Sequence, residues 1–264
     1  MKKTLAIINF ISVLFVLIVN YLSQALRFNN TTIGELSDSY DNLFTPAGYA
    51  FAIWGLIFLS LIGYAVYQIR KAFFSPKNSE FIEQTGYWFC IANLLNGCWV
   101  IAFVYEYTGL SVLIMIGILI SLIKVILNTN MERWDAPIGI ILFVWWPICL
   151  YSGWIAVATI ANIATYLVKI DWNGFTLSEE GWTVAMIVIA MVINILMIVM
   201  KNMREFALVG AWALIAIYMR HKDSIDYIAI TALICAIILI IVSGTHGYLN
   251  RKTNPFNKLL ERFR

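Results

Sequence analysis

Eight long apolar segments, separated by short polar loops, constrain the fold of this 264-residue chain more than any other feature. A bilayer core takes roughly 20 apolar residues per helical crossing. Lipid offers the backbone no hydrogen-bond partners, so a spanning segment must be a helix or part of a closed barrel. Barrel strands alternate apolar and polar residues, and these segments do not. The expected crossings are residues 4–26, 46–69, 85–105, 109–128, 138–166, 182–200, 204–219 and 225–244.

The composition leads to the same class of protein. The chain is 61% hydrophobic and 12% charged, with a mean hydropathy of +0.82, which excludes a water-soluble domain of this length. We therefore expect an all-α, polytopic membrane helical bundle with about eight transmembrane helices.

The Lys and Arg residues predict how the chain is oriented. With eight crossings and a cytoplasmic N-terminus, all but four of the 18 Lys and Arg residues fall on the cytoplasmic side. The four exceptions are Arg27, Lys169, Arg220 and Lys222. This is the positive-inside distribution, so we predict that both termini are cytoplasmic. The net charge of +3 then reflects topology, and no nucleic-acid partner is expected.

No motif in the chain predicts a metal, a cofactor or catalysis. The four cysteines, which lie in apolar segments without a Cys-x-x-Cys pair, are Cys90, Cys98, Cys149 and Cys235. They therefore carry no zinc or iron–sulfur signature. His221 and His246 are interpreted as solvated or interfacial side chains rather than haem ligands. Because a phosphate-binding loop and catalytic motifs are also absent from the sequence, we expect a protein that is not an enzyme.

The tryptophans divide into two groups by their position along the apolar segments. Four lie near helix ends, where the aromatic belt of a membrane protein accounts for them: Trp88, Trp134, Trp172 and Trp182. The other six lie deeper, where an indole N–H needs a partner. Three of these deep residues stand in the middle of stripes at helical spacing: Phe51, Trp54 and Phe58; Asn96, Trp99 and Phe103; and Tyr151, Trp154, Ala158 and Asn162. Such stripes either pack helices together or line a flat, aromatic-walled ligand cavity.

Three collinear blocks resemble the TspO/MBR family of tryptophan-rich sensory proteins and translocator proteins. The blocks are Tyr40-Asp41-Asn42-Leu43 through Pro46, Gly48, Phe51 and Trp54; Asn96-Gly97-Cys98-Trp99; and Tyr151-Ser152-Gly153-Trp154 through Ala158 and Asn162. They follow the family order on the second, third and fifth expected helices. One departure is Thr45-Pro46-Ala47, which stands where the family usually has two prolines.

The resemblance implies a division of the chain and a ligand site. Residues 1–172 correspond to a five-helix TspO/MBR-like membrane domain, and residues 173–264 are expected to form a three-helix C-terminal extension with a basic tail. The site residues that the family carries over are Trp54, Asn96, Trp99, Trp154, Ala158 and Asn162. Helical spacing adds Phe58, Phe103 and Tyr151 to this predicted cavity.

These observations favour an integral membrane sensor or receptor-like protein that binds a flat apolar ligand between its first five helices. A tetrapyrrole such as porphyrin or haem, or a sterol-like molecule, fits that description. The expected partners are the lipid bilayer, this ligand and, as a candidate, a second copy of the chain in a homodimer. The alternative is a small-solute transporter or channel that uses all eight helices; its usual signs are repeats and broken helices, and here Pro147 is the only interior break. A membrane enzyme acting on a bound pigment is a third hypothesis, for which no catalytic group stands out.

Overall fold

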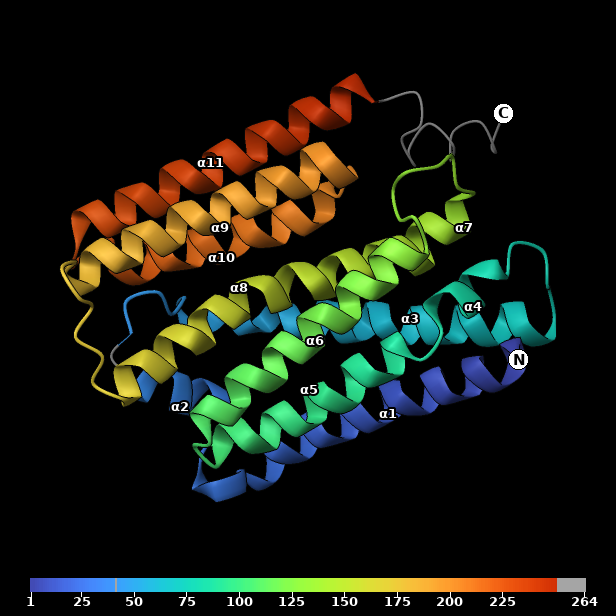
Figure 1. The fold of residues 1–264 in the computed structure, drawn as a ribbon, viewed down its shortest axis with the longest axis horizontal. Coiled ribbons are helices and arrows are strands. Elements are labelled where there is room, and N and C mark those ends of the chain that lie inside the picture. Colours follow the sequence, from blue (N-terminus) through green and yellow to red (C-terminus); the bar gives the residue numbers. More distant parts are fainter. Residues whose placement is uncertain (41, 251–264) are drawn as a thin grey trace. The chain divides into compact units, whose positions relative to one another are not determined.

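The computed structural model describes residues 1–40 and 42–250, and every regular element in these ranges is a helix (Figure 1). The prediction of an all-α fold is therefore confirmed. Residue 41 and the predicted basic tail, residues 251–264, lie outside the described residues.

The chain forms two compact units, each built from separate stretches of sequence. The first unit comprises Met1–Asn42, Phe51–Thr129 and Ala158–Asn173. Within it, α1 packs against α3 and α5, and α5 packs against α6. Its complete α-helices are α1 (Lys2–Leu26), α2 (Ile33–Ser39), α3 (Ile53–Phe73), α4 (Glu80–Thr85), α5 (Trp88–Val104) and α6 (Thr108–Asn128).

The second unit comprises Leu43–Ala50, Asn130–Val157 and Gly174–Arg264. Three of its helices, α9, α10 and α11, pack against one another and run side by side in Figure 1. Its complete helices are α7 (Ile138–Ile140), α9 (Glu179–Lys201), α10 (Arg204–His221) and α11 (Asp226–Leu249), with a π-helical turn at Ile141–Trp145.

One helix, α8 (Trp146–Lys169), runs through both units. It belongs to the second unit as far as Val157 and to the first unit from Ala158 onward. The units are thus interleaved along the chain, whereas the sequence-based division is a single break after residue 172. That division, into a family domain and an extension, stays a prediction.

Helix boundaries follow local sequence. At the start of α2, Thr32 Oγ1 accepts a hydrogen bond from the Glu35 amide while the Glu35 carboxylate accepts one from the Thr32 amide, which is a capping box. At the start of α9, Ser178 Oγ accepts from the Gly181 amide at 3.1 Å. Helix α9 ends at Lys201 and is capped by Asn202, whose φ of 61° is a left-handed conformation that asparagine adopts more readily than most residues.

Six helices of the described chain are long and apolar enough to cross a membrane. Two of the eight expected crossings fall outside this group. Helix α5 has only 17 residues, and α10 carries Arg204, Glu205 and Arg220 among its 18 residues. The membrane bundle is therefore established, whereas the count of eight stays a prediction.

Candidate functional site

Seven of the nine predicted site residues lie in the first unit, and four of them are buried there. On α5, the Trp99 and Phe103 rings stack with centroids 5.2 Å apart and planes inclined by 20°. Asn96, on the same helix, is fully buried, and its Oδ1 accepts a hydrogen bond from Asn20 Nδ2 at 3.3 Å. The expectation that this amide points inward, away from lipid, agrees with its burial.

Asn162 connects three helices of the first unit. Its Oδ1 accepts the indole N–H of Trp99 at 3.2 Å, and its Nδ2 donates to Ser111 Oγ at 2.9 Å. The deep indole thereby obtains the partner that it needs. Trp99 and Asn162 are thus brought together as predicted, through a bond that holds α5, α6 and α8 in place.

The remaining predicted residues of the first unit are more accessible. On α3, Trp54 and Phe58 stack with ring centroids 5.0 Å apart and planes inclined by 25°, and both are half-buried. Ala158 on α8 is also half-buried. The predicted site residues of the first unit therefore include both buried and partly open side chains.

The other two predicted residues, Tyr151 and Trp154, are buried in the second unit. Two residues beyond Tyr151 stands Gly153, where α8 comes close to α10. A Cβ added at Gly153 would lie 2.8 Å from the backbone oxygen of Phe206 and 3.1 Å from Val209 Cβ. A cavity lined by all nine predicted residues stays a prediction.

A polar cavity in the second unit was not predicted from the sequence. Its volume is about 70 Å³, enough for a few water molecules or a small ion with its ligands. Its polar lining comes from the loop after α6, from the start of α10 and from the end of α11. The residues that line it are Glu132, Trp134, Asp135, Ala136, Ile141, Trp145, Asn202, Arg204, Glu205, His246 and Asn250.

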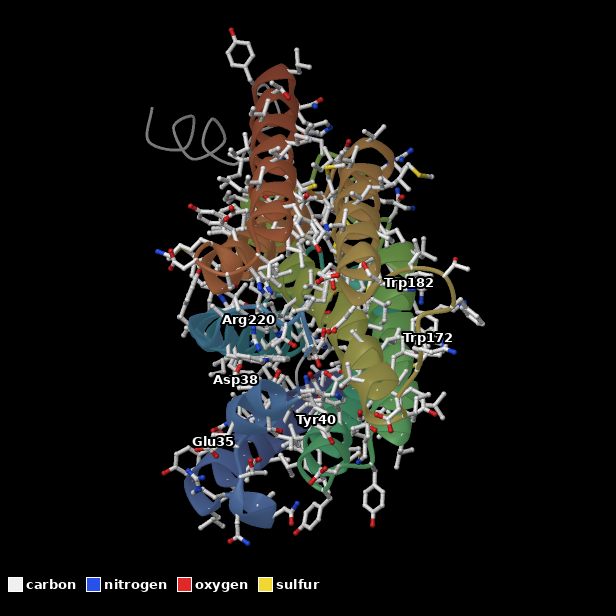
Figure 2. All side chains as sticks on the ribbon, turned by 90° about the vertical axis from the view of Figure 1, so that its left-hand side faces the viewer. Glu35, Asp38, Tyr40, Trp172, Trp182 and Arg220 are labelled. Carbon is white, nitrogen blue, oxygen red and sulfur yellow. The ribbon has the colours of Figure 1, made fainter. Side chains whose placement is uncertain are left out.

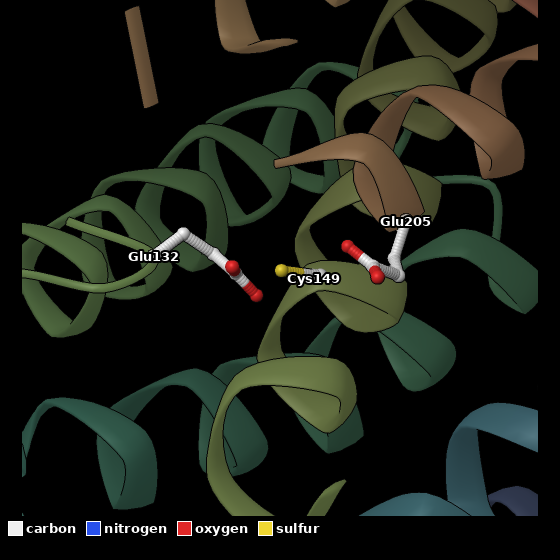
Figure 3. Close-up of side chains that lie close together, drawn as sticks. All are labelled: Glu132, Cys149 and Glu205. Carbon is white, nitrogen blue, oxygen red and sulfur yellow. The ribbon is translucent and has the colours of Figure 1, made fainter. Parts of the chain in front are cut away.

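A buried thiol lies beside two of the carboxylates of this cavity. Figure 3 shows the Cys149 side chain on α8 directed between Glu132 and Glu205. The sulfur and one carboxylate oxygen of each glutamate lie within 4.8 Å of one another. Cys149 follows the π-helical turn at Ile141–Trp145, which precedes Pro147. Proline has no N–H to continue the regular helical ladder, so the wider turn is expected at this place.

Three ionisable side chains of the cavity lining have buried atoms without a hydrogen-bond partner among residues 1–40 and 42–250. These atoms are Glu205 Oε2, Arg204 Nε and His246 Nδ1. Buried polar atoms almost always have partners in folded proteins, and leaving a charged one unsatisfied is costly. This cavity therefore differs from a packed apolar core in holding ionisable atoms whose hydrogen-bonding capacity is unused.

One of the two histidines differs from the expectation of solvated or interfacial side chains. His221 is buried, and its Nε2 lies 2.8 Å from the carbonyl oxygen of Leu43, so the solvated interpretation is wrong for this residue. His246 is half-buried at the end of α11, and its Nε2 lies 3.3 Å from Asn250 Nδ2. Sequence reasoning missed the burial of His221 because its partner, Leu43, belongs to a distant segment of the chain.

Hydrogen bonds and ion pairs between ionisable side chains connect the polar loops of the first unit. Figure 2 labels Glu35 on α2 and Tyr40 immediately after it. The Tyr40 hydroxyl donates to Glu106 Oε2 at 2.9 Å, and Lys169 Nζ lies 3.7 Å from the same oxygen. Burial, followed by the hydrogen bond and charge of Glu106, raises the pKa of Tyr40 to about 12. The Arg27 guanidinium, 2.7 Å from Glu35 Oε2, lowers the pKa of that carboxyl.

The helices and their apolar surfaces define a multi-pass integral membrane protein. In a comparison with models of known families, residues 6–245 match the TSPO-like protein family. The chain belongs to this family, as its aromatic blocks predicted. The match continues beyond residue 172 through α9 and α10 and into α11. Comparisons with curated proteins and with solved structures gave no match.

Proposed function

We propose that the protein is a membrane receptor or sensor that binds a flat apolar ligand in an aromatic cavity between the helices of its first unit. The class of ligand is a tetrapyrrole, such as a porphyrin, or a sterol-like molecule. The observation that carries the proposal is the pair of stacked rings on each of two helices, Trp54 with Phe58 and Trp99 with Phe103. The role is one of binding, without catalysis, and a homodimer is the proposed form.

Ring stacking supports a preference for a flat ligand. A well-placed aromatic pair contributes about 0.5–1.5 kcal/mol beyond the burial of its area. Loss of one ring from the site should therefore weaken binding by about 2- to 12-fold, since 1.4 kcal/mol corresponds to tenfold. Ala158 acts differently, because a small side chain leaves room that a larger one would fill.

The test is a titration of the purified chain with protoporphyrin, followed by quenching of tryptophan emission. We expect saturable quenching that Trp99→Leu and Trp54→Leu weaken and that Ala158→Phe abolishes. Trp154→Leu then tests whether the predicted site also uses this residue of the second unit. Each variant is checked for intact folding by its thermal unfolding.

Trp88→Leu is the matched control. Trp88 lies on α5 like Trp99, 11 residues earlier and so roughly 16 Å away along the helix. This variant should bind protoporphyrin as the unaltered chain does. Absence of saturable quenching in the unaltered chain, or equal weakening by Trp88→Leu and Trp99→Leu, refutes the proposal.

A small-solute transporter or channel is the second candidate, and the interrupted helix supports it. Transporters often place broken helices near their substrate, and the span Ile138–Lys169 contains the π-helical turn before Pro147. Flux of a small solute into proteoliposomes that is lost in Pro147→Leu would favour this candidate over a receptor.

For the topology, we propose that both termini are cytoplasmic, as the positive-inside distribution predicts. Reporter fusions after Lys201 and after Arg264 should report the same compartment. Reports from opposite sides of the membrane would rule out eight crossings.

A further inference from the structure

We propose that Glu132, Cys149 and Glu205 form a binding site for a thiophilic divalent cation of the zinc class. This inference concerns the second unit and is independent of the ligand proposed for the first unit. One sulfur and two carboxylate oxygens, from three separate segments of the chain, already lie within 4.8 Å of one another.

The donor set fits zinc in the type of its atoms, and its spacing is about 1 Å wider than zinc ligands require. Zinc binds cysteine sulfur at about 2.3 Å and carboxylate oxygen at about 2.0–2.2 Å, so ligand atoms around a tetrahedral ion are about 3.3–3.7 Å apart. Contraction of the present group by about 1 Å would satisfy this geometry. The thiolate disfavours magnesium, calcium and manganese, which prefer oxygen ligands.

Two further observations point to a ligand rather than to chance proximity. The Cys149 thiol is fully buried, makes no hydrogen bond within the described ranges, and is directed between the two carboxylates (Figure 3). Glu205 Oε2 is also buried without a partner in that part of the chain. A bound cation would satisfy both atoms at once.

The neighbouring Arg204 side chain completes the charge balance of the site. A thiolate and two carboxylates carry three negative charges, which a divalent cation together with the Arg204 guanidinium neutralises. The buried Arg204 Nε has no hydrogen-bond partner among the described residues. It can then donate to a ligating carboxylate, as residues that surround metal ligands commonly do. His246 lines the same cavity but lies outside this group of three, so the fourth position of a tetrahedral ion is left for a water molecule.

The test uses the full chain, without an affinity tag, purified in detergent with its thiols reduced and titrated with Co²⁺. We expect one Co²⁺ per chain and a thiolate-to-cobalt charge-transfer absorption band. Zn²⁺ should abolish the band because it binds such sites more tightly than Co²⁺, whereas Mg²⁺ should not. A chain that shows no band at saturating Co²⁺ overturns the proposal.

Matched variants identify the ligands. Cys149→Ser should remove the band, whereas Cys235→Ser, which alters another buried cysteine of the second unit, should retain it. Glu132→Gln and Glu205→Gln should weaken Co²⁺ binding by at least the roughly 10–100-fold that follows the loss of a residue hydrogen-bonded to a metal ligand. Glu180→Gln is the control and should bind Co²⁺ as the unaltered chain does. The isosteric glutamine variants test the site even where Cys149→Ser fails to fold. Persistence of the band in Cys149→Ser, or unchanged affinity in both glutamine variants, contradicts the assignment.

Discussion

Both units hold buried polar atoms without a hydrogen-bond partner among the described residues, but in the first unit these belong to neutral amides and a serine, whereas the polar cavity of the second unit keeps ionisable atoms in this state. In the first unit, Asn9 Nδ2 donates to Gln68 Oε1 at 2.9 Å, and Asn93 Nδ2 donates to Ser12 Oγ at 3.0 Å. In the second unit, within the described residues, Glu205 Oε2 has no such partner.

The contrast separates two uses of polar residues inside a membrane protein. Neutral amides that bond across helices stabilise packing by about 0.6 kcal/mol each and rarely more than 1.7. Ionisable side chains in such places are costly and mark binding or transport sites. The two units therefore differ in the kind of buried polar side chain they hold, neutral amides in the first unit and ionisable groups in the cavity of the second.

The largest effect on thermal stability is expected from Gly153→Ala. This substitution tests whether the second unit is tightly packed outside its polar cavity. The new Cβ would lie 2.8 Å from the Phe206 backbone oxygen, which cannot move aside cheaply. Overpacking of this kind costs about 1–3 kcal/mol. The thermal unfolding temperature should fall. Gly244→Ala on α11 meets no atom within 4 Å and should leave it unchanged or raise it. Equal behaviour of the two variants would show that the second unit packs loosely throughout.

Asn162→Leu should have the next largest effect, because it removes the amide that the first unit uses for structure. The Trp99 indole and the Ser111 hydroxyl each lose a bond. We expect a loss of about 0.6–1.7 kcal/mol in the free energy of unfolding, the range for such bonds in membranes. Asn128→Leu, at the exposed end of α6, is the control. A loss in the free energy of unfolding no larger than that of the control would contradict a structural role for Asn162.

A smaller effect, dependent on pH, is expected at the loop edge of the first unit. Folding raises the pKa of Tyr40 from 10.0 to about 12, so its stabilising contribution is complete below pH 10 and is lost as the pH rises toward 12. The loss should stay within about 1 kcal/mol because the pair is partly exposed. Tyr40→Phe should reduce this decline in unfolding temperature, and Tyr21→Phe, an exposed tyrosine of α1, should not. Parallel pH profiles for all three chains would contradict the assignment.

The smallest effect is expected from Glu205→Gln measured in the presence of a chelator. Removing the charge of a buried carboxylate that lacks a hydrogen-bond partner relieves desolvation, so the unfolding temperature should stay the same or rise slightly. A fall as large as that of Asn162→Leu would mean that Glu205 is structural, and the contrast between the units would fail.

Periodicity and composition were sufficient to predict the class of the fold. Apolar runs of bilayer length predicted helices, and three aromatic blocks predicted the family before any contact was known. The family resemblance placed Trp99 and Asn162 in the same predicted site, and the two side chains do form a hydrogen bond.

The cavity of the second unit could not be predicted in the same way. Its three proposed ligands stand at positions 132, 149 and 205, without the short spacings that make a metal motif recognisable. One lies in a loop, one after a π-helical turn and one in the first turn of α10. Their proximity depends on tertiary packing, which cannot be predicted from the local pattern of a single sequence.

Because the two units alternate along the chain, the ribosome cannot complete them at the same time. Every segment of the first unit exists once Asn173 has been made, but the second unit waits for α11, which ends at Leu249. At about 5–20 residues per second, this interval lasts roughly 4–15 s. A nascent chain stopped in the early part of this interval, before residue 204, would display Glu132, Cys149 and the start of α8 without Glu205, α10 and α11. We expect such a fragment to be a substrate for membrane quality control rather than a smaller working protein.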